Sequence, residues 1–168
     1  MYLVRSEPER RLGRRLEVAG ELARMGAHAA GRELCAAIFL EHASLPRADH
    51  ETKQRFIECL LLLRMTNLLT RFLEACAGIR VEIAIEEDDG AEHMAFALPS
   101  GERLRARLPQ AGLDRHQRER FAAFWGQRLL ELTEGLGDAG SARRRPVGVF
   151  LVHYGFTPES ASISVRTA

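Results

Sequence analysis

The chain has 168 residues and a formal net charge of +1, with 46% hydrophobic and 28% charged residues. This length suits a single domain, and this composition is that of a folded globular protein, which excludes collagen-like, low-complexity and fully disordered chains. A nearly neutral chain gives no global electrostatic reason to bind nucleic acid or an anionic membrane.

Residues 7–44 carry apolar and small side chains at spacings of three and four, which predicts helix. One unbroken helix of that length would extend about 57 Å, whereas a compact domain of this size is roughly 40 Å across. We therefore expect a break between Gly26 and Gly31, because glycine weakens a helix interior. A single projecting helix is the alternative.

Residues 50–77 give the strongest helical pattern in the chain, with Asp49 as a candidate N-cap. The polar face starts with Glu51, Arg55 and Glu58 and then moves to nearly the opposite side. We expect one helix with two opposed apolar faces, and therefore a homodimer that covers them. The expected interface residues are Leu60, Leu61, Met65, Leu68, Leu69 and Phe72.

After Gly78 the hydrophobic period changes from 3.6 to 2, which predicts strands. Residues 79–85, 93–98 and 103–108 are expected to form an antiparallel meander. Two more strands are expected at residues 147–152 and 160–166. The outward side chains of the meander predict an exposed charge ladder across a floor of alanines. Its expected members are Glu82, Glu86, Arg103, Arg105 and Arg107.

A long amphipathic helix is predicted over residues 114–136, between the third and fourth strands, with Asp114 and Gln117 resembling a capping box. Its aromatic stripe is expected to face the core, and a linker follows at residues 137–145. The predicted fold class is therefore α+β. An N-terminal layer of two to three helices (1–77), which is also the candidate dimerisation layer, joins a mostly antiparallel sheet of about five strands (78–168) in one cooperative domain.

The order of elements over residues 60–168 is helix, three strands, helix, two strands. This order resembles the class I type III secretion chaperones, which are small dimeric α+β proteins that bind extended segments of an effector. Those chaperones are usually acidic and shorter, and they lack a long N-terminal helical region. The resemblance implies a dimer with a protein partner and depends on the order of elements alone, because no sequence motif carries it.

Catalytic and cofactor motifs are missing from the sequence. It contains no P-loop, GxGxxG, GxSxG or close Cys/His pairs, so no cofactor or metal is expected. One polar cluster follows the strand at 147–152, where His153 and Tyr154 are candidates for an acid–base pair. With Trp125 they are also candidates for lining a ligand pocket between the sheet and the helix at 114–136. The simpler interpretation is that His153 and Tyr154 are solvated residues at the end of a strand and that Trp125 is a core aromatic residue.

The leading functional interpretation is a non-enzymatic cytoplasmic binding, adaptor or regulatory protein, homodimeric, with a protein partner. No membrane partner is expected, since the longest apolar runs fall far short of the ~20 residues that cross a bilayer. Three cysteines, an odd number within helical patterns, predict free thiols in a reducing compartment. One alternative is a small enzyme or small-molecule sensor that uses the pocket near His153 and Tyr154. The other is nucleic-acid binding through the arginine rows at 103–107 and 143–145.

Overall fold

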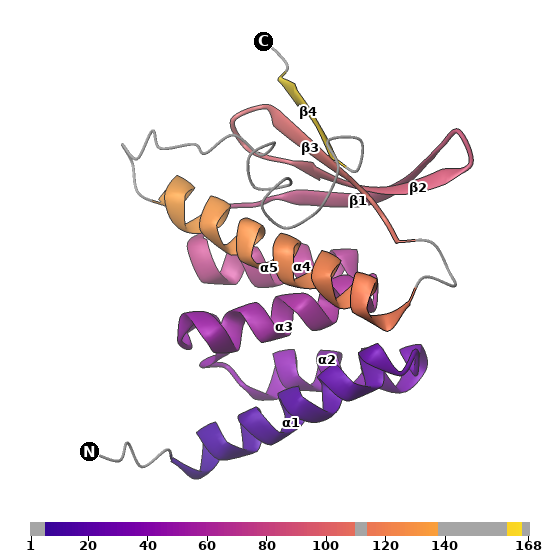
Figure 1. Ribbon diagram of the computed structural model, residues 1–168. Helices are drawn as coiled ribbons and strands as arrows, with labels where there is room; N and C mark the ends of the chain where they lie inside the picture. The colour runs from indigo at the N-terminus through magenta and orange to yellow at the C-terminus, as the bar shows by residue number, and fades with distance from the viewer. Residues whose placement is uncertain (1–5, 110–113, 138–160, 166–168) are drawn as a thin grey trace.

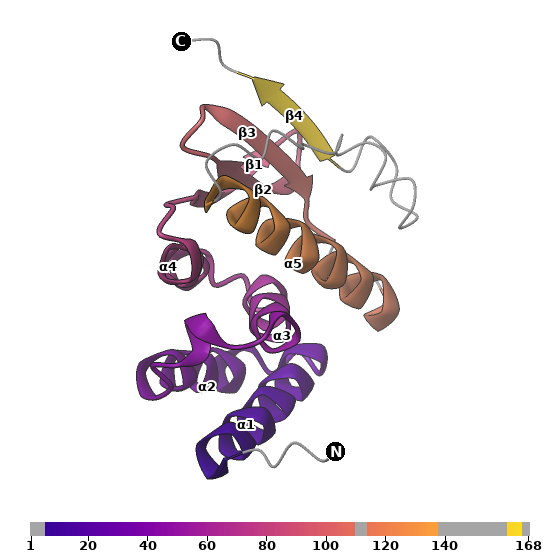
Figure 2. The same ribbon diagram turned by 90° about the vertical axis from the view of Figure 1, so that its left-hand side faces the viewer.

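The computed structural model describes residues 6–109, 114–137 and 161–165 (Figure 1). The elements, in chain order, are α1 (Glu7–Arg24), α2 (His28–Glu41), the 3₁₀ helix η1 (Leu45–Arg47), α3 (His50–Leu62), α4 (Thr66–Ala77), β1 (Glu82–Asp88), β2 (Ala91–Ala97), β3 (Glu102–Arg107), α5 (Arg115–Gly137) and β4 (Ala161–Val165). The helices α1 and α2 lie at one end of the molecule and the sheet at the other. The other three helices lie between these two ends: α3 is next to α1 and α2, and α4 and α5 are nearer the sheet in both views (Figures 1 and 2).

The N-terminal helical region divides at Gly26, as the sequence predicts. Gly26 has a φ of +79°, a left-handed conformation that glycine adopts without steric cost. The amide of Ala27 donates to the carbonyl of Leu22 at 2.9 Å, which closes α1 in a Schellman turn. At its other end, Ser6 and Glu9 form a reciprocal capping box. The chain then returns as α2, which packs along α1.

The prediction of one helix over residues 50–77 is wrong, because the chain turns between α3 and α4. Arg64 takes a φ of +59° there. The amide of Met65 donates to the carbonyl of Leu60 at 2.9 Å, and the amide of Arg64 to the carbonyl of Leu61 at 3.2 Å. This is the same Schellman turn, made here without glycine. The polar face changes side because two separate helices each keep one apolar stripe.

The predicted sheet of about five strands is also wrong. The described residues form a four-stranded antiparallel sheet in the order β1-β2-β3-β4, and the expected strand at 147–152 lies outside them, as does most of the predicted linker at 137–145. The strands β1 and β2 are joined by Asp89 and Gly90, with φ values of +50° and +77°. Two consecutive positive φ angles are those of the type I′ turn, which matches the twist of a hairpin.

The predicted placement of the helices needs correction as well. Four α-helices precede the sheet, not two to three. They do not form one layer on the sheet: α4 contacts β1, while α3 packs against α1 and α5. The long helix α5 therefore lies between α3 and the sheet (Figure 2). The physical reason is the turn at Arg64, which lets α4 leave the direction of α3.

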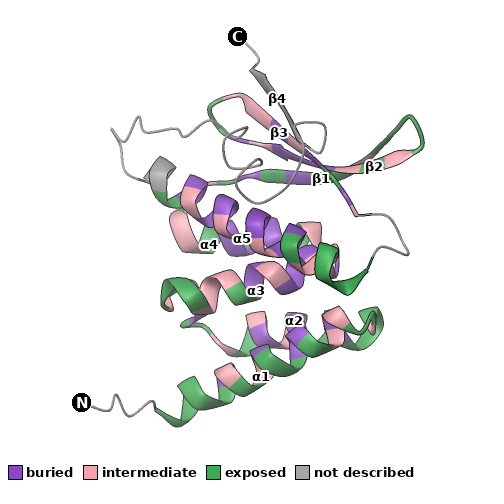
Figure 3. Cartoon of the chain, viewed as in Figure 1, coloured by how far each residue is buried: buried purple, intermediate pink, exposed green. Residues whose placement is uncertain are grey.

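The aromatic stripe of α5 faces the core, as predicted. Trp125 stacks on Phe96 of β2 with ring centroids 5.3 Å apart, and Phe124 meets Trp125 edge-on at 5.2 Å. Asp114 caps the helix by accepting from the amide of Gln117 at 2.8 Å. The buried apolar side chains of all these layers form one cluster, visible as the inward purple faces of the helices (Figure 3).

Two helical glycines provide a matched test of this packing. A Cβ at Gly31 would lie 2.9 Å from Leu63 Cδ2 of the fully buried Leu63, whereas a Cβ at Gly13 would meet nothing within 4 Å. We expect Gly31→Ala to lower the free energy of unfolding by about 1–3 kcal/mol through overpacking. Gly13→Ala should raise it by about 0.5–1 kcal/mol, because alanine is the better helix former. Urea unfolding measures both, and a stabilised Gly31→Ala variant would refute the close approach of α2 to α3.

Candidate functional site

The sequence-predicted catalytic pair, His153 and Tyr154, lies outside the described residues. The third candidate, Trp125, is 1% exposed. Its ring is in contact with those of Phe96 and Phe124, so aromatic side chains fill this part of the space between sheet and α5. The described surroundings of Trp125 are therefore those of a core packing residue.

The six residues expected at a dimer interface are covered by their own chain. Four are fully buried: Leu60, Leu61, Leu69 and Phe72. The other two, Met65 and Leu68, are partly buried against the same core. Their cover comes from α1, α5, η1 and β1, which contact α3 and α4. The apolar excess seen in the sequence is thus satisfied within one molecule.

The predicted charge ladder is confirmed on the outer face of the sheet. Arg103 Nη2 lies 3.3 Å from Glu86 Oε1, and Arg105 Nη2 lies 3.4 Å from Asp88 Oδ2. Ala95 of the middle strand lies between these partners and is buried although it points outward, as expected where arginine stems cover an alanine floor. Glu82, which was also expected in the ladder, pairs with Arg80 instead.

These ion pairs weaken the nucleic-acid alternative. A phosphate-binding row needs cations that are free to pair with the backbone, whereas Arg103 and Arg105 already face carboxylates. Arg107 is exposed and has no ion pair with a residue that the structure describes. The second arginine row, 143–145, lies outside the described residues.

A polar cluster ties the C-terminal end of α1 to α3 and the start of α5. Arg24 Nε lies 3.2 Å from Glu119 Oε1, and Arg115 Nη2 lies 3.7 Å from Glu21 Oε1. Glu58 of α3 lies beside them, and burial raises the pKa of its carboxyl, opposed by the charge of Arg24. These groups bridge packed helices, which is the position of structural ion pairs.

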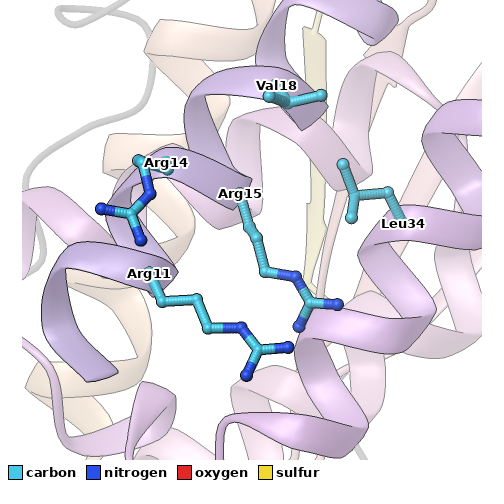
Figure 4. Close-up of a pocket in the computed structure, with 5 residues that line it drawn as sticks. All are labelled: Arg11, Arg14, Arg15, Val18 and Leu34. Atoms are coloured by element: carbon cyan, nitrogen blue, oxygen red, sulfur yellow. The ribbon is translucent and has the colours of Figure 1, made fainter. Parts of the chain in front are cut away.

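One open site with mixed chemistry lies between α1 and α2, and we call it the α1–α2 groove (Figure 4). It is an open pocket of about 180 Å³. Its lining residues are Arg11, Arg14, Arg15, Val18 and Leu34. Four of the five come from α1, where spacings of three, four and seven place side chains on one face. Leu34 adds an apolar wall from α2.

The arginines of the groove differ in their partners. Arg14 Nη2 lies 3.3 Å from Glu7 Oε1, and Arg15 pairs with Glu41. Arg11 forms no ion pair within the described part of the chain. Figure 4 shows the side chains of Arg11 and Arg15 extending in the same direction. One guanidinium at the groove is therefore free to pair with an anion.

Histidine at the edge of the groove adds no further positive charge at neutral pH. Arg15 Nη1 lies 3.2 Å from His42 Nε2. Burial and the charges of Arg15 and Arg11 lower the pKa of His42. The bond from Arg15 likewise lowers the pKa of Glu41, which stays ionised.

Exposed apolar side chains continue the same face of α1 beyond the arginines. Val18 is 53% exposed, and Met25, at the C-cap of α1, is 70% exposed. Sequence reasoning did not single out this face, because the apolar stripe of α1 identified the buried side. The signal that was available was Val18, an apolar residue on the polar side of the helix, one turn after Arg14 and Arg15 and two turns after Arg10 and Arg11.

The search for relatives gives no further guidance. No protein-family model, curated protein or solved structure matches the chain, so the resemblance to secretion chaperones gains no support. The described residues include no group of three or more His, Cys, Asp or Glu side chains placed to hold a metal ion. None of the described helices is long and apolar enough to cross a membrane. Function is therefore inferred from the geometry alone.

The charge ladder leads to a prediction about stability. Arg105→Ala removes two partly exposed ion pairs, to Glu86 and to Asp88, whose contribution is typically ~0–1 kcal/mol each, so the free energy of unfolding should fall by no more than about 2 kcal/mol. Phe96→Ala, on the inner face of the neighbouring strand, removes a buried ring and should cost about 3–5 kcal/mol. Urea unfolding of both variants makes the comparison. A loss from Arg105→Ala as large as that from Phe96→Ala would show that the arginine row is more than a surface ladder.

The raised pKa of Glu58 leads to a prediction about pH. The folded state holds the Glu58 proton more tightly than the unfolded chain does, so ionisation of Glu58 lowers stability as pH rises through the raised pKa. Glu58→Gln should therefore be more stable than the parent protein at neutral pH, and the gain should shrink as the pH falls below the usual range of a glutamate. Thermal unfolding over a pH series measures this. Glu51→Gln, on the exposed side of the same helix, is the control, and an equal gain there would contradict the assignment.

Proposed function

We propose that this protein is a non-enzymatic binding protein of the adaptor type, and that the α1–α2 groove is where its partner docks. The observation that carries the proposal is the combination, on one helix face, of a half-exposed apolar side chain at Val18 with the guanidinium of Arg11, which has no ion pair with any described residue. Folded monomers expose single apolar residues routinely, but an apolar face that borders a cationic pocket is typical of a recognition surface.

The chemistry of the groove favours an acidic amphipathic helix of a protein partner. Arg11 and its neighbours attract carboxylates, while Val18, Leu34 and Met25 offer apolar contact farther along the same face. A docked helix presents side chains at spacings of three, four and seven, which is the spacing that α1 itself offers. Charge complementarity thus selects the acidic helix over a basic one.

A cytoplasmic location is part of the proposal. All three cysteines are free thiols, which is the state that a reducing compartment maintains. The homodimer expected from the sequence loses its proposed interface, because the faces of α3 and α4 are covered. A second copy of the chain is therefore the competing occupant of the groove, and the test below distinguishes it.

Binding is tested with a synthetic helical peptide that carries leucines on one face, glutamates beside them and a fluorescent label. We expect saturable binding to the protein by fluorescence anisotropy, and none of a matched peptide with lysines in place of glutamates. Arg11→Glu should weaken binding about tenfold or more, because it opposes like charges at the contact. Arg107→Glu makes the same charge change on the sheet, at the other end of the molecule, and should leave binding unchanged.

Three outcomes would overturn the proposal. If Arg11→Glu and Arg107→Glu lose binding equally, the loss comes from the change in net charge and not from the groove. If the acidic peptide does not bind at all, an acidic helix is excluded as the partner. The third is a stable dimer of the 18.8 kDa chain at micromolar concentration that Arg11→Glu dissociates. In light scattering that result would assign the groove to a second copy.

A further inference from the structure

Two of the three cysteines meet inside the helical layer. The thiols of Cys35 in α2 and Cys59 in α3 lie close enough to interact, and their side chains are 0% and 4% exposed. The third, Cys76 of α4, is half-buried and has no thiol partner among the described residues. A contact between two thiols from different helices is the arrangement that an intramolecular disulfide requires.

The packing of α2 on α3 supports this contact independently. Gly31 lies one turn before Cys35, and Leu63 lies one turn after Cys59. A Cβ at Gly31 would be only 2.9 Å from Leu63 Cδ2, so the two helices approach closely at that level. Going from the pair Gly31 and Leu63 to the pair Cys35 and Cys59 advances four residues along α2 and goes back four residues along α3. The two pairs are therefore successive levels of one antiparallel helix crossing. The glycine allows the approach that brings the sulfurs together.

We propose that Cys35 and Cys59 form a reversible intramolecular disulfide when the protein meets a peroxide. The Cys59 sulfur, as thiolate, attacks one oxygen of hydrogen peroxide, and the O–O bond breaks. The departing hydroxide takes up the proton that the Cys59 thiol released, which leaves a sulfenic acid on Cys59 and one water. The Cys35 sulfur then attacks the Cys59 sulfur, and its proton leaves with the hydroxyl as a second water. Two thiols are oxidised by two electrons, and one peroxide is reduced to two waters.

The order of the two thiols follows from their environment. The hydrogen bond from Cys35 lowers the pKa of Cys59, against the effect of burial, while the same bond and burial raise the pKa of Cys35. Cys59 is also the less completely buried of the two, at 4% exposed against 0%, so in the proposed step Cys59 forms the nucleophilic thiolate and Cys35 is the resolving thiol. Burial raises the pKa of the isolated Cys76 to about 11, which makes that thiol a poor nucleophile.

Peroxide reaches the buried pair when α2 opens. The N-cap residue of this helix, Ala27, makes no side-chain hydrogen bond, and the helix contains Gly31 in its first turns, so it has a weaker N-terminus than α1, α3 or α5. Such a segment opens locally without global unfolding. The disulfide would then tie α2 to α3 and hold it closed.

The test uses the full chain without denaturant, treated with hydrogen peroxide and then alkylated in denaturant. Trypsin places the three cysteines in separate peptides, 33–47, 56–64 and 72–80, so mass spectrometry without reduction identifies each link. We expect peptides 33–47 and 56–64 to be joined with the loss of two hydrogens, peptide 72–80 to be alkylated, and dithiothreitol to reverse the link. The oxidised chain should also have a higher Tm than the reduced chain.

Matched variants separate the pair from general oxidation. Cys76→Ala should keep both the link and the rise in Tm, and Cys35→Ala should lose both. The proposal is overturned if Cys35 and Cys59 stay fully alkylatable at peroxide concentrations that oxidise Cys76. It is equally overturned if every link joins two molecules. The parent protein alone decides between these results, so a variant that folds poorly does not affect the outcome.

Discussion

The left-handed turn at Arg64 determines how the rest of the chain is arranged. A helix that continued from residue 50 to residue 77 would present two opposed apolar faces, and one molecule could not cover both. The turn ends α3 at Leu62 and starts α4 at Thr66, so each short helix directs its single stripe into the same core. The helix α3 then faces α1 and α5, while α4 reaches β1. The left-handed φ of one arginine thereby lets the apolar stripes of both helices enter one intramolecular core.

Much of the secondary structure could be predicted because its signals are local. Gly26 marks the end of α1, the alternation after Gly78 marks the strands, and Asp114 marks the start of α5. The turn at Arg64 could not be predicted, since a left-handed arginine carries no sequence signal comparable to glycine. The helical spacing of apolar residues continues across such a break, so the sequence of two helices looks like that of one. The expectation of two opposed apolar faces on one helix followed from that single misreading.

The candidate site was missed for a related reason. Pattern analysis finds the buried face of a helix, because burial imposes periodicity, but the exposed face of α1 obeys no such rule. Nothing in the sequence says that Arg14 and Arg15 have acidic partners while Arg11 has none among the described residues, since Glu41 comes to Arg15 from the next helix. The ladder on the sheet was predictable by contrast, because strand register fixes which side chains face each other across a middle strand.

The helix α2 connects the two proposals physically. Leu34 forms a wall of the α1–α2 groove, and the next residue, Cys35, faces α3 and Cys59. Adjacent residues on a helix point about 100° apart, so one turn of α2 serves the outer surface and the core at once. Any opening of α2 that exposes the thiols also removes Leu34 from the groove. A bound partner that contacts Leu34 would hold α2 in place and protect the thiols, and a disulfide would keep the groove formed, so the two events stabilise the same conformation.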